Sequence, residues 1–144
     1  MLEVRRVEEL QDFFVAYAHA FEVADVPAIT ARWAYPCHVT SDLVDTLSVV
    51  AVPSAQAFEG PVRQVLELYR RAGMKRIRLL ELDVEALSGQ LRRATVRWGL
   101  TGLADLPLYD FTTSYVLGRF EGQWRLVSAV AHDELRAYRR FLGR

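Results

Sequence analysis

The feature that most constrains the fold is a Glu121-Gly122 pair that separates two long, apolar-rich segments near the end of the chain. An aromatic residue, Trp124, and alternating aliphatic residues follow it. Such a two-residue loop predicts a β-hairpin, because glycine readily adopts the positive φ that a tight hairpin turn requires. We therefore expect two long antiparallel strands to meet at this turn and to close a curved sheet with a pocket on one face.

A two-residue loop also determines which residues lie opposite one another on the two strands. Side chains paired in this way share a face of the sheet. The predicted pairs are mostly apolar and aromatic, with a few polar groups between them, so we expect this face to be covered and to line the pocket. The pairs are Phe120 with Gln123, Leu117 with Leu126, Tyr115 with Ser128, Thr113 with Val130, and Phe111 with His132.

The preceding hairpin turns near Ser88-Gly89, and its charges indicate the register. A two-residue loop would place Asp83 and Glu81 on the face that holds Trp98. A three-residue loop with a bulge avoids this, because a one-residue slip reverses every side chain. We therefore predict the three-residue loop, which aligns Ala94, Val96 and Trp98 with Val84, Leu82 and Leu80.

The first half of the chain has the periodicity of helices. Between residues 7 and 23, apolar side chains recur at three- and four-residue steps, which predicts a helix with one buried face. Asp25 can cap a second, short helix, which should end at Tyr35-Pro36 because a residue before proline avoids helical geometry. The predicted helices cover residues 7–23, 26–34, 54–73 and 134–142, and the predicted strands cover residues 37–40, 47–52 and four long segments between 75 and 133.

Length and charge restrict the class of protein. The chain has 144 residues, of which 51% are hydrophobic, and this predicts a single domain over residues 1–144. The 18 basic and 18 acidic residues cancel, so no net field attracts nucleic acid or an anionic membrane. Arginine pairs such as Arg92-Arg93 are scattered, and we interpret them as solvated surface.

Cysteine content and apolar runs indicate the compartment. Cys37 is the only cysteine, which excludes an internal disulfide and a cysteine-based metal cluster within one chain. The N-terminus is charged from its third residue and does not resemble a signal peptide. No stretch approaches the roughly 20 apolar residues that span a membrane. We expect a cytoplasmic protein without a membrane partner.

Two motifs in this arrangement resemble those of a known superfamily. One is Tyr17-x7-Asp25-x3-Ile29-x3-Trp33, and the other is the Gly-x-Trp-Arg-aliphatic run at residues 122–127. With three helices, a strand pair and a four-stranded meander, they resemble the NTF2-like superfamily, which includes SnoaL-like cyclases and ketosteroid isomerases. The resemblance implies an α+β fold, a cone-shaped cystatin-like roll with three N-terminal helices packed on a curved mixed or antiparallel sheet and a short C-terminal helix.

The resemblance also implies catalytic positions, and this chain matches only part of them. In ketosteroid isomerases of similar layout, a tyrosine on the first helix hydrogen-bonds the enolate oxygen, and Tyr17 matches it by spacing. The position of their catalytic aspartate falls on Ser41, whose hydroxyl is too weak an acid to act as a base at neutral pH. Asp42 is adjacent, but neighbours on a strand point to opposite faces. A second oxyanion partner has no match, since Asp110 is predicted on the outer face.

Three residues are candidate catalytic groups. His132 is predicted on the inner face and is of the residue type that most often acts as an acid or base, Tyr17 could donate to an oxyanion, and Asp42 could act as acid or base. Each also has a structural interpretation, as part of the core or of the rim of the cone. The candidate ligand-binding residues are Tyr17, Trp33, Trp98, Phe111, Thr113, Tyr115, Ser128, Val130 and His132.

No cofactor or metal is predicted. The sequence has no phosphate-binding loop, serine elbow or dinucleotide fingerprint. His38, Asp42 and His132 follow no spacing that is typical of metal ligands, so we interpret their grouping as chance.

Three functions remain open from the sequence. The protein could bind a small, mostly apolar molecule in the cone, or it could be a cofactor-independent isomerase, cyclase or dehydratase. It could also be a structural homodimer with a filled cone. We expect a homodimer through the outer sheet face, because the predicted outer row of Val127, Ala129 and Ala131 is small and apolar for a solvated surface.

Overall fold

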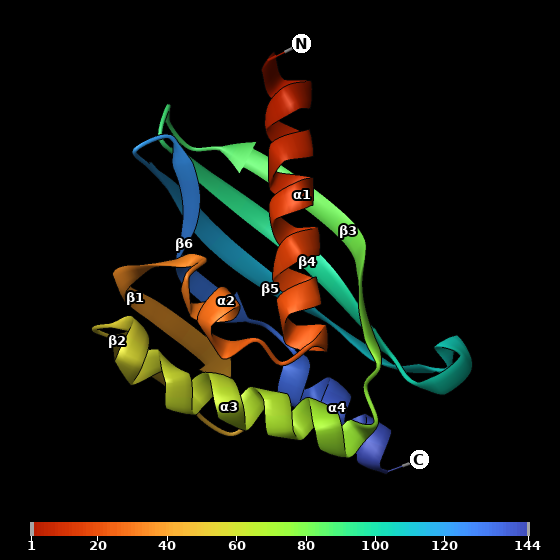
Figure 1. Cartoon of the computed structure of the whole chain (residues 1–144). Helices are drawn as coiled ribbons and strands as arrows, with labels where there is room; N and C mark the ends of the chain where they lie inside the picture. Colours follow the sequence, from red (N-terminus) through yellow and green to blue (C-terminus); the bar gives the residue numbers. More distant parts are fainter. Residues whose placement is uncertain (1, 144) are drawn as a thin grey trace.

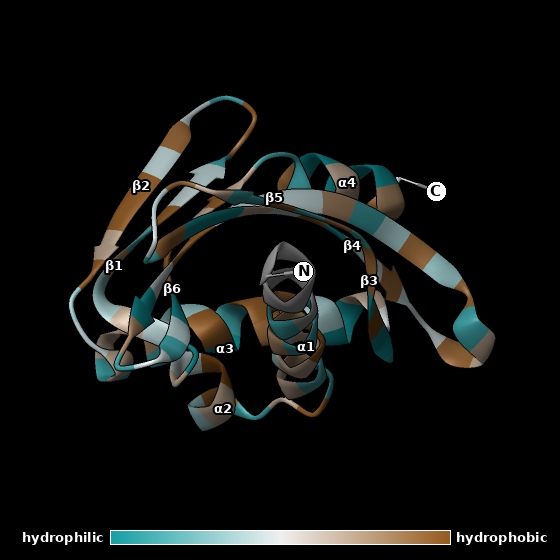
Figure 2. Cartoon of the chain, turned by 90° about the horizontal axis from the view of Figure 1, so that it is seen from above, coloured by the Kyte–Doolittle hydropathy of each residue, from teal (hydrophilic) through white to brown (hydrophobic). Residues whose placement is uncertain are grey.

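The chain folds around a six-stranded mixed sheet that curves over its longest helix. The computed structural model describes residues 2–143, with side chains from residue 9 to residue 143. The strand order is β2-β1-β6-β5-β4-β3. Figure 2 shows the sheet bent into an arch, with α1 on its concave side. This arrangement confirms the cone-shaped α+β fold expected from the sequence.

The order of helices and strands along the chain is close to the expected one (Figure 1). The helices are α1 (Leu2–Glu22), α2 (Val26–Thr30), α3 (Ala55–Ala72) and α4 (Glu134–Leu142), with a short 3-10 helix, η1 (Leu103–Asp105). The strands are β1 (Trp33–Asp42), β2 (Leu47–Val52), β3 (Arg76–Ala86), β4 (Leu91–Thr101), β5 (Pro107–Phe120) and β6 (Gln123–Ala131). Within the described residues, no helix is long and apolar enough to cross a membrane.

The apolar face of α1 packs against the concave face of the sheet. Phe14 is fully buried, and its ring lies 5.1 Å from that of Tyr115 and 6.1 Å from that of Trp98, centroid to centroid. Phe21, near the end of the same helix, approaches Tyr69 of α3 at 6.1 Å. These aromatic contacts join α1, α3 and the central strands into one core.

Both ends of α3 follow from local sequence signals. The Ser54 side chain accepts a hydrogen bond from the Ala57 N–H, which satisfies one free donor of the first turn. Gly73 ends the helix with a φ of +84°, a conformation that glycine adopts without steric cost. Pro61 lies inside the helix without ending it.

The second helix is shorter than the sequence predicts, so the expected range of 26–34 is wrong. It ends at Thr30, and β1 begins at Trp33. Backbone carbonyls beyond Thr30 are taken by β6: Arg125 donates to the Ala31 oxygen and the Leu126 N–H donates to the Arg32 oxygen, both at 2.8 Å. These bonds replace the helical ones and bring β1 into parallel pairing with β6.

The Glu121-Gly122 turn is confirmed as a two-residue hairpin loop. Both residues have positive φ, +51° and +81°, and Phe120 pairs with Gln123. Leu117 also pairs with Leu126, as predicted.

Beyond Leu126 the predicted register of this hairpin is wrong. Val116 pairs with Ser128 and Thr113 pairs with Ala131, so Val127 is an extra residue in β6. A bulge of this kind reverses the direction of every later side chain in the strand. Ser128, Val130 and His132 therefore face outward, whereas Ala129 and Ala131, predicted on the outer face, point into the cone.

The β3–β4 hairpin has the predicted register over most of its length. Ala94 pairs with Val84 and Val96 pairs with Leu82. Trp98 pairs with Leu79 instead of Leu80, because the register shifts between Leu79 and Glu81.

One arginine expected on the solvated surface is instead buried. Arg92 points to the inner face of the sheet, as every second residue of β4 does, and it is only 1% exposed. Its guanidinium lies 5.1 Å from the centre of the Trp124 ring and donates to the Ser88 oxygen at 2.6 Å. A buried arginine retains favourable contacts in this way, through a π face and a backbone carbonyl.

Candidate functional site

A cavity of about 350 Å³ lies between α1, α3 and the concave face of the sheet. Its walls are mainly aromatic and aliphatic. Six of the nine candidate ligand-binding residues line it: Tyr17, Trp33, Trp98, Phe111, Thr113 and Tyr115. The other lining residues are Ala18, Phe21, Val39, Ser41, Val50, Val52, Phe58, Pro61, Val62, Gln64, Val65, Tyr69, Ile77, Ala129, Ala131 and Glu134.

Two tryptophan–tyrosine pairs provide polar groups in this apolar wall. The Trp33 indole N–H donates to the Tyr17 hydroxyl at 3.0 Å, and the Trp98 indole N–H donates to the Tyr115 hydroxyl at 2.9 Å. An indole can only donate, whereas a phenolic hydroxyl both accepts and donates. Each tyrosine therefore accepts from its tryptophan and keeps its own hydrogen for another partner. Burial raises the pKa of Tyr17 and of Tyr115, so both hydroxyls remain protonated donors at neutral pH.

A third polar group lies where α3 meets the start of α4. The hydroxyl of Tyr69, a residue 5% exposed in the last turns of α3, donates to Glu134 Oε1 at 2.6 Å. Glu134 is the first residue of α4, and both side chains line the cavity. Tyr109 of β5 holds α4 in place, because its ring packs against those of Tyr138 and Phe141 at 5.9 and 5.6 Å.

Burial shifts the titration of this pair. Burial in apolar surroundings raises the pKa of Glu134 above its ordinary value of 4.5, and the hydrogen bond from Tyr69 opposes the rise. Burial and the neighbouring carboxylate raise the pKa of Tyr69 well above 10, so the tyrosine is the donor. Among the described side chains, no lysine, arginine or histidine lines the cavity, and Glu134 is the one carboxylate that does.

His132 and Asp42, the predicted acid–base groups, do not line this cavity. His132 is exposed on the outer face, where its Nε2 lies 2.7 Å from the Ser114 hydroxyl oxygen, and the Val127 bulge places it there. The Asp42 carboxylate accepts from the Val44 N–H at 2.8 Å in the β1–β2 loop. Its neighbour Ser41 lines the cavity, as strand alternation predicts.

The sequence also predicts the wrong face of the sheet for two other candidate ligand-binding residues. Ser128 and Val130 lie on the outer face for the same reason as His132, because each follows the bulge. Ala129 and Ala131 take their places in the cavity wall. Small side chains at these two positions leave room in the cone that larger ones would fill.

The Tyr69–Glu134 pair has no direct signal in the sequence. Tyr69 lies on the apolar stripe of the third predicted helix, where a core position is the simplest interpretation. Glu134 follows the last strand at the start of a helix, where an acidic residue ordinarily interacts with the free N–H groups. Only the packing of α4 on β5, which places its first residue beside α3, brings together these two residues, 65 positions apart.

The described side chains do not form a metal-binding group. No three histidine, cysteine, aspartate or glutamate side chains between residues 9 and 143 lie close enough together to hold a metal ion. Cys37 is buried in β1, and burial raises the pKa of its thiol.

Comparisons with known proteins agree with the fold. A family model described as NTF2-like protein (DUF6841) matches residues 8–134. The chain belongs to this NTF2-like family. A comparison with curated proteins found no match.

Solved structures support the same fold. Aln2 from a Streptomyces species is 17% identical, with a TM-score of 0.69 over 92% of this chain and 93% of its own. An NTF2-like protein with a cystatin-like fold from Novosphingobium aromaticivorans is 15% identical, with a TM-score of 0.68 over 98% and 93%. An NTF2-like protein of unknown function from Shewanella oneidensis is 11% identical, with a TM-score of 0.64 over 89% and 99%. At these identities the likeness concerns the fold alone.

Proposed function

We propose that the protein binds a small, mostly apolar molecule in the cone cavity. The observation that carries the proposal is the cavity itself, about 350 Å³ in volume with mainly aromatic and aliphatic walls. Ligand sites typically have volumes of about 300–1,000 Å³, apolar walls and a few well-placed polar groups. The hydroxyls of Tyr17 and Tyr115 are such groups, and each can donate to an oxygen of the ligand.

The geometry favours binding over the two other functions considered. The enzymatic interpretation assigned the acid–base role to His132 or Asp42, and neither side chain reaches the cavity lining. The interpretation as a structural protein requires a filled cone, whereas space remains beside Trp33, Trp98 and Tyr115.

Native mass spectrometry of freshly purified protein is the first test. We expect the mass under gentle conditions to exceed the mass under denaturing conditions by that of a small organic molecule. The released species would give the ligand class. A protein that carries no small molecule would be titrated next with N-phenyl-1-naphthylamine, a neutral apolar probe whose fluorescence rises in an apolar site.

A pair of neighbouring substitutions separates cavity binding from surface binding. Ala131→Phe places a ring in the cavity, whereas Val130→Phe places the same ring on the outer face, where Val130 is 41% exposed. We expect the first variant to lose probe binding and the second to retain it. Equal binding by both variants, or no binding by the wild-type protein, would contradict the proposal.

A further inference from the structure

The charged group in the cavity wall limits the chemistry of the ligand that the cavity can accept. Glu134 contributes a carboxylate, and no basic residue is among the described side chains that line the cavity beside it. Within the part of the chain whose side chains are described, no basic side chain forms an ion pair with Glu134, and its recorded partner is the Tyr69 hydroxyl. The carboxylate therefore has hydrogen-bonding capacity left, because an ionised carboxylate accepts at both oxygens.

The Tyr69 contact favours the ionised form of Glu134. The 2.6 Å separation of the two oxygens is typical of a hydrogen bond from a hydroxyl to a charged carboxylate. Tyr69 donates to Oε1, and Oε2 is left for another donor. Since a charge withdrawn from water needs an opposite charge or hydrogen bonds, this half-buried carboxylate would gain from a positively charged partner in the cavity.

The aromatic walls favour the same sign of charge. Trp33, Trp98 and Tyr115 line the cavity, and the faces of such rings carry partial negative charge that attracts cations. The two indoles direct their N–H groups to tyrosine hydroxyls, so the Tyr17 and Tyr115 hydroxyls are uncharged donors, and the described side chains that line the cavity offer an anion no charged donor. A negatively charged ligand would meet both the carboxylate and these rings.

From these observations we infer that the ligand of this cavity is a mostly apolar molecule that carries a protonated amine, and that Glu134 binds the ammonium group. This inference rests on the proposed function, because it names the ligand class for the same cavity. The apolar part of the ligand would pack against the aromatic walls, and the ammonium would donate to Glu134 Oε2. Tyr69 is a positioning residue, since it holds the carboxylate through Oε1.

Three probes of matched shape test the inference by isothermal titration calorimetry at pH 7. They are 2-aminoindane, which is protonated, 2-indanol, which is neutral, and indane-2-carboxylate, which is an anion. We expect the amine to bind roughly tenfold more tightly than the alcohol, as for a hydrogen bond to a charged group, and the carboxylate to bind most weakly. If the wild-type protein binds the amine no better than the alcohol, the inference is wrong.

The variant Glu134→Gln removes the charge and keeps an oxygen that accepts from Tyr69. We expect the preference for the amine to fall to less than roughly threefold, while affinity for 2-indanol stays within about threefold of wild type. The matched control is Glu59→Gln, which makes the same change at an exposed residue of α3 outside the cavity lining and should retain the full amine preference. A strong amine preference in Glu134→Gln would overturn the assignment of Glu134.

The outcomes distinguish this inference from the proposed function. If all three probes bind equally and Ala131→Phe abolishes their binding, the cavity binds apolar molecules but does not select amines. If none of the probes binds, the inference is overturned, and native mass spectrometry still decides the proposed function independently. If Glu134→Gln does not fold, the wild-type order of the three probes remains the deciding result.

Discussion

Two hydrogen bonds between residues that line the cavity also contribute to the stability of the fold. The Trp33 indole N–H is buried, and the Tyr17 hydroxyl is its recorded partner. Removal of an acceptor from a buried donor leaves that donor unsatisfied, which destabilises the fold more than loss of both partners together. The same reasoning applies to Trp98 and Tyr115.

We expect Tyr17→Phe to lower the free energy of unfolding by about 1–3 kcal/mol, because the Trp33 N–H loses its acceptor. Urea denaturation followed by circular dichroism would measure the change. The double variant Tyr17→Phe/Trp33→Phe should be less destabilised than the sum of the two single variants, since neither buried polar group remains. A Tyr17→Phe variant as stable as wild type would show that the contact contributes nothing.

We expect Glu134→Gln to raise the free energy of unfolding at pH 7 by on the order of 1 kcal/mol. Substitution of a residue that serves binding often stabilises the folded protein by such an amount. Burial raises the pKa of Glu134 in the folded state, so its contribution to stability is fully present below the ordinary value of 4.5. That contribution is lost as the pH rises through the raised value. A glutamine does not ionise and avoids this loss.

Thermal unfolding of both proteins between pH 4 and pH 8 would measure this difference. The advantage of Glu134→Gln should grow with pH over that range. The tyrosines near Glu134, residues 69, 109 and 115, stay protonated in this window because burial raises each of their pKa values. A variant that is less stable than wild type at pH 7 would mean that the ionised carboxylate is already well compensated in the unliganded protein.

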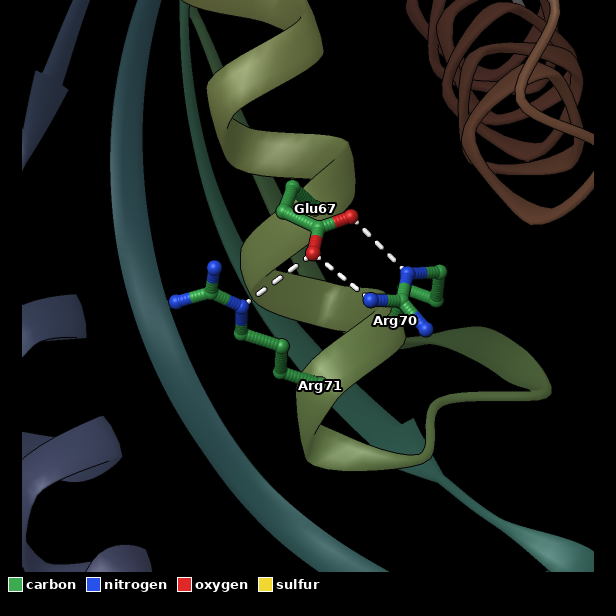
Figure 3. A network of polar contacts seen from close by, with 3 residues as sticks. All are labelled: Glu67, Arg70 and Arg71. Carbon is green, nitrogen blue, oxygen red and sulfur yellow. Dashed lines mark hydrogen bonds and ion pairs between the residues drawn. The ribbon is translucent and has the colours of Figure 1, made fainter.

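At the scale of elements, α3 carries an ion-pair network near its C-terminal end (Figure 3). Glu67 accepts from Arg70 at 2.7 and 2.8 Å and from Arg71 at 3.1 Å. Both arginines lie in the last turn, where positive charge also interacts favourably with the helix dipole. The hydrogen bond from Arg70 is the largest contribution that lowers the pKa of Glu67, to about 2.

We expect Glu67→Gln to reduce the stability of the protein slightly near neutral pH and to remove part of its sensitivity to acid. Because the folded-state pKa is lowered, the stabilisation is present above the ordinary value of 4.5 and is lost as the pH falls toward about 2. Thermal unfolding at pH 7, 4 and 2.5 would test this. Glu59→Gln on the same helix is the control, and an equal effect of both substitutions would contradict the role of the network.

For the whole molecule, the homodimer expected from the sequence remains a proposal, and its basis changes. Ala129 and Ala131 face the cavity and cannot form a dimer surface. The outer face instead presents Val130 between β5 and β1, and a charged row in which Arg97 pairs with Glu81 and Asp110. A two-fold axis through this face would bring the same residues of two copies together.

We expect light scattering at micromolar concentration to give the mass of a dimer. Val130→Arg should convert that dimer to a monomer, because it places two like charges close to the axis. Val15→Arg is the control, since Val15 is exposed on α1 and away from the outer sheet face. A monomeric wild-type protein would contradict the proposal.

Much of the fold could be predicted because its signals are local. The positive φ at Glu121 and Gly122, the serine cap of α3 and its terminal Gly73 are properties of a few adjacent residues. The register of β3 and β4 was also accessible, since the alternative would have buried a row of charges. That register predicted correctly that Trp98 points toward the core, and the Glu121-Gly122 turn predicted the same for Tyr115.

The candidate site was predicted only in part, because the sequence did not reveal the one-residue shift in the pairing of β5 with β6. An extra residue at Val127 leaves the alternation of the sequence intact on either side and carries no signal of its own. It moves His132 to the outer face and brings Ala131 into the cavity. The three candidate ligand-binding residues that fall outside the cavity, Ser128, Val130 and His132, are therefore those that follow the bulge.

Three helices, the hairpin turns and the aromatic character of the cone follow from the sequence alone, because each depends on periodicity or on turn chemistry within a short segment. The tertiary structure decided which polar groups enter the cavity. The contact between Tyr69 and Glu134 depends on how α4 packs on β5, which brings its first residue to α3. Packing between distant segments is cooperative and leaves no mark on either segment alone, so the carboxylate that distinguishes this cavity could be found only in the folded protein.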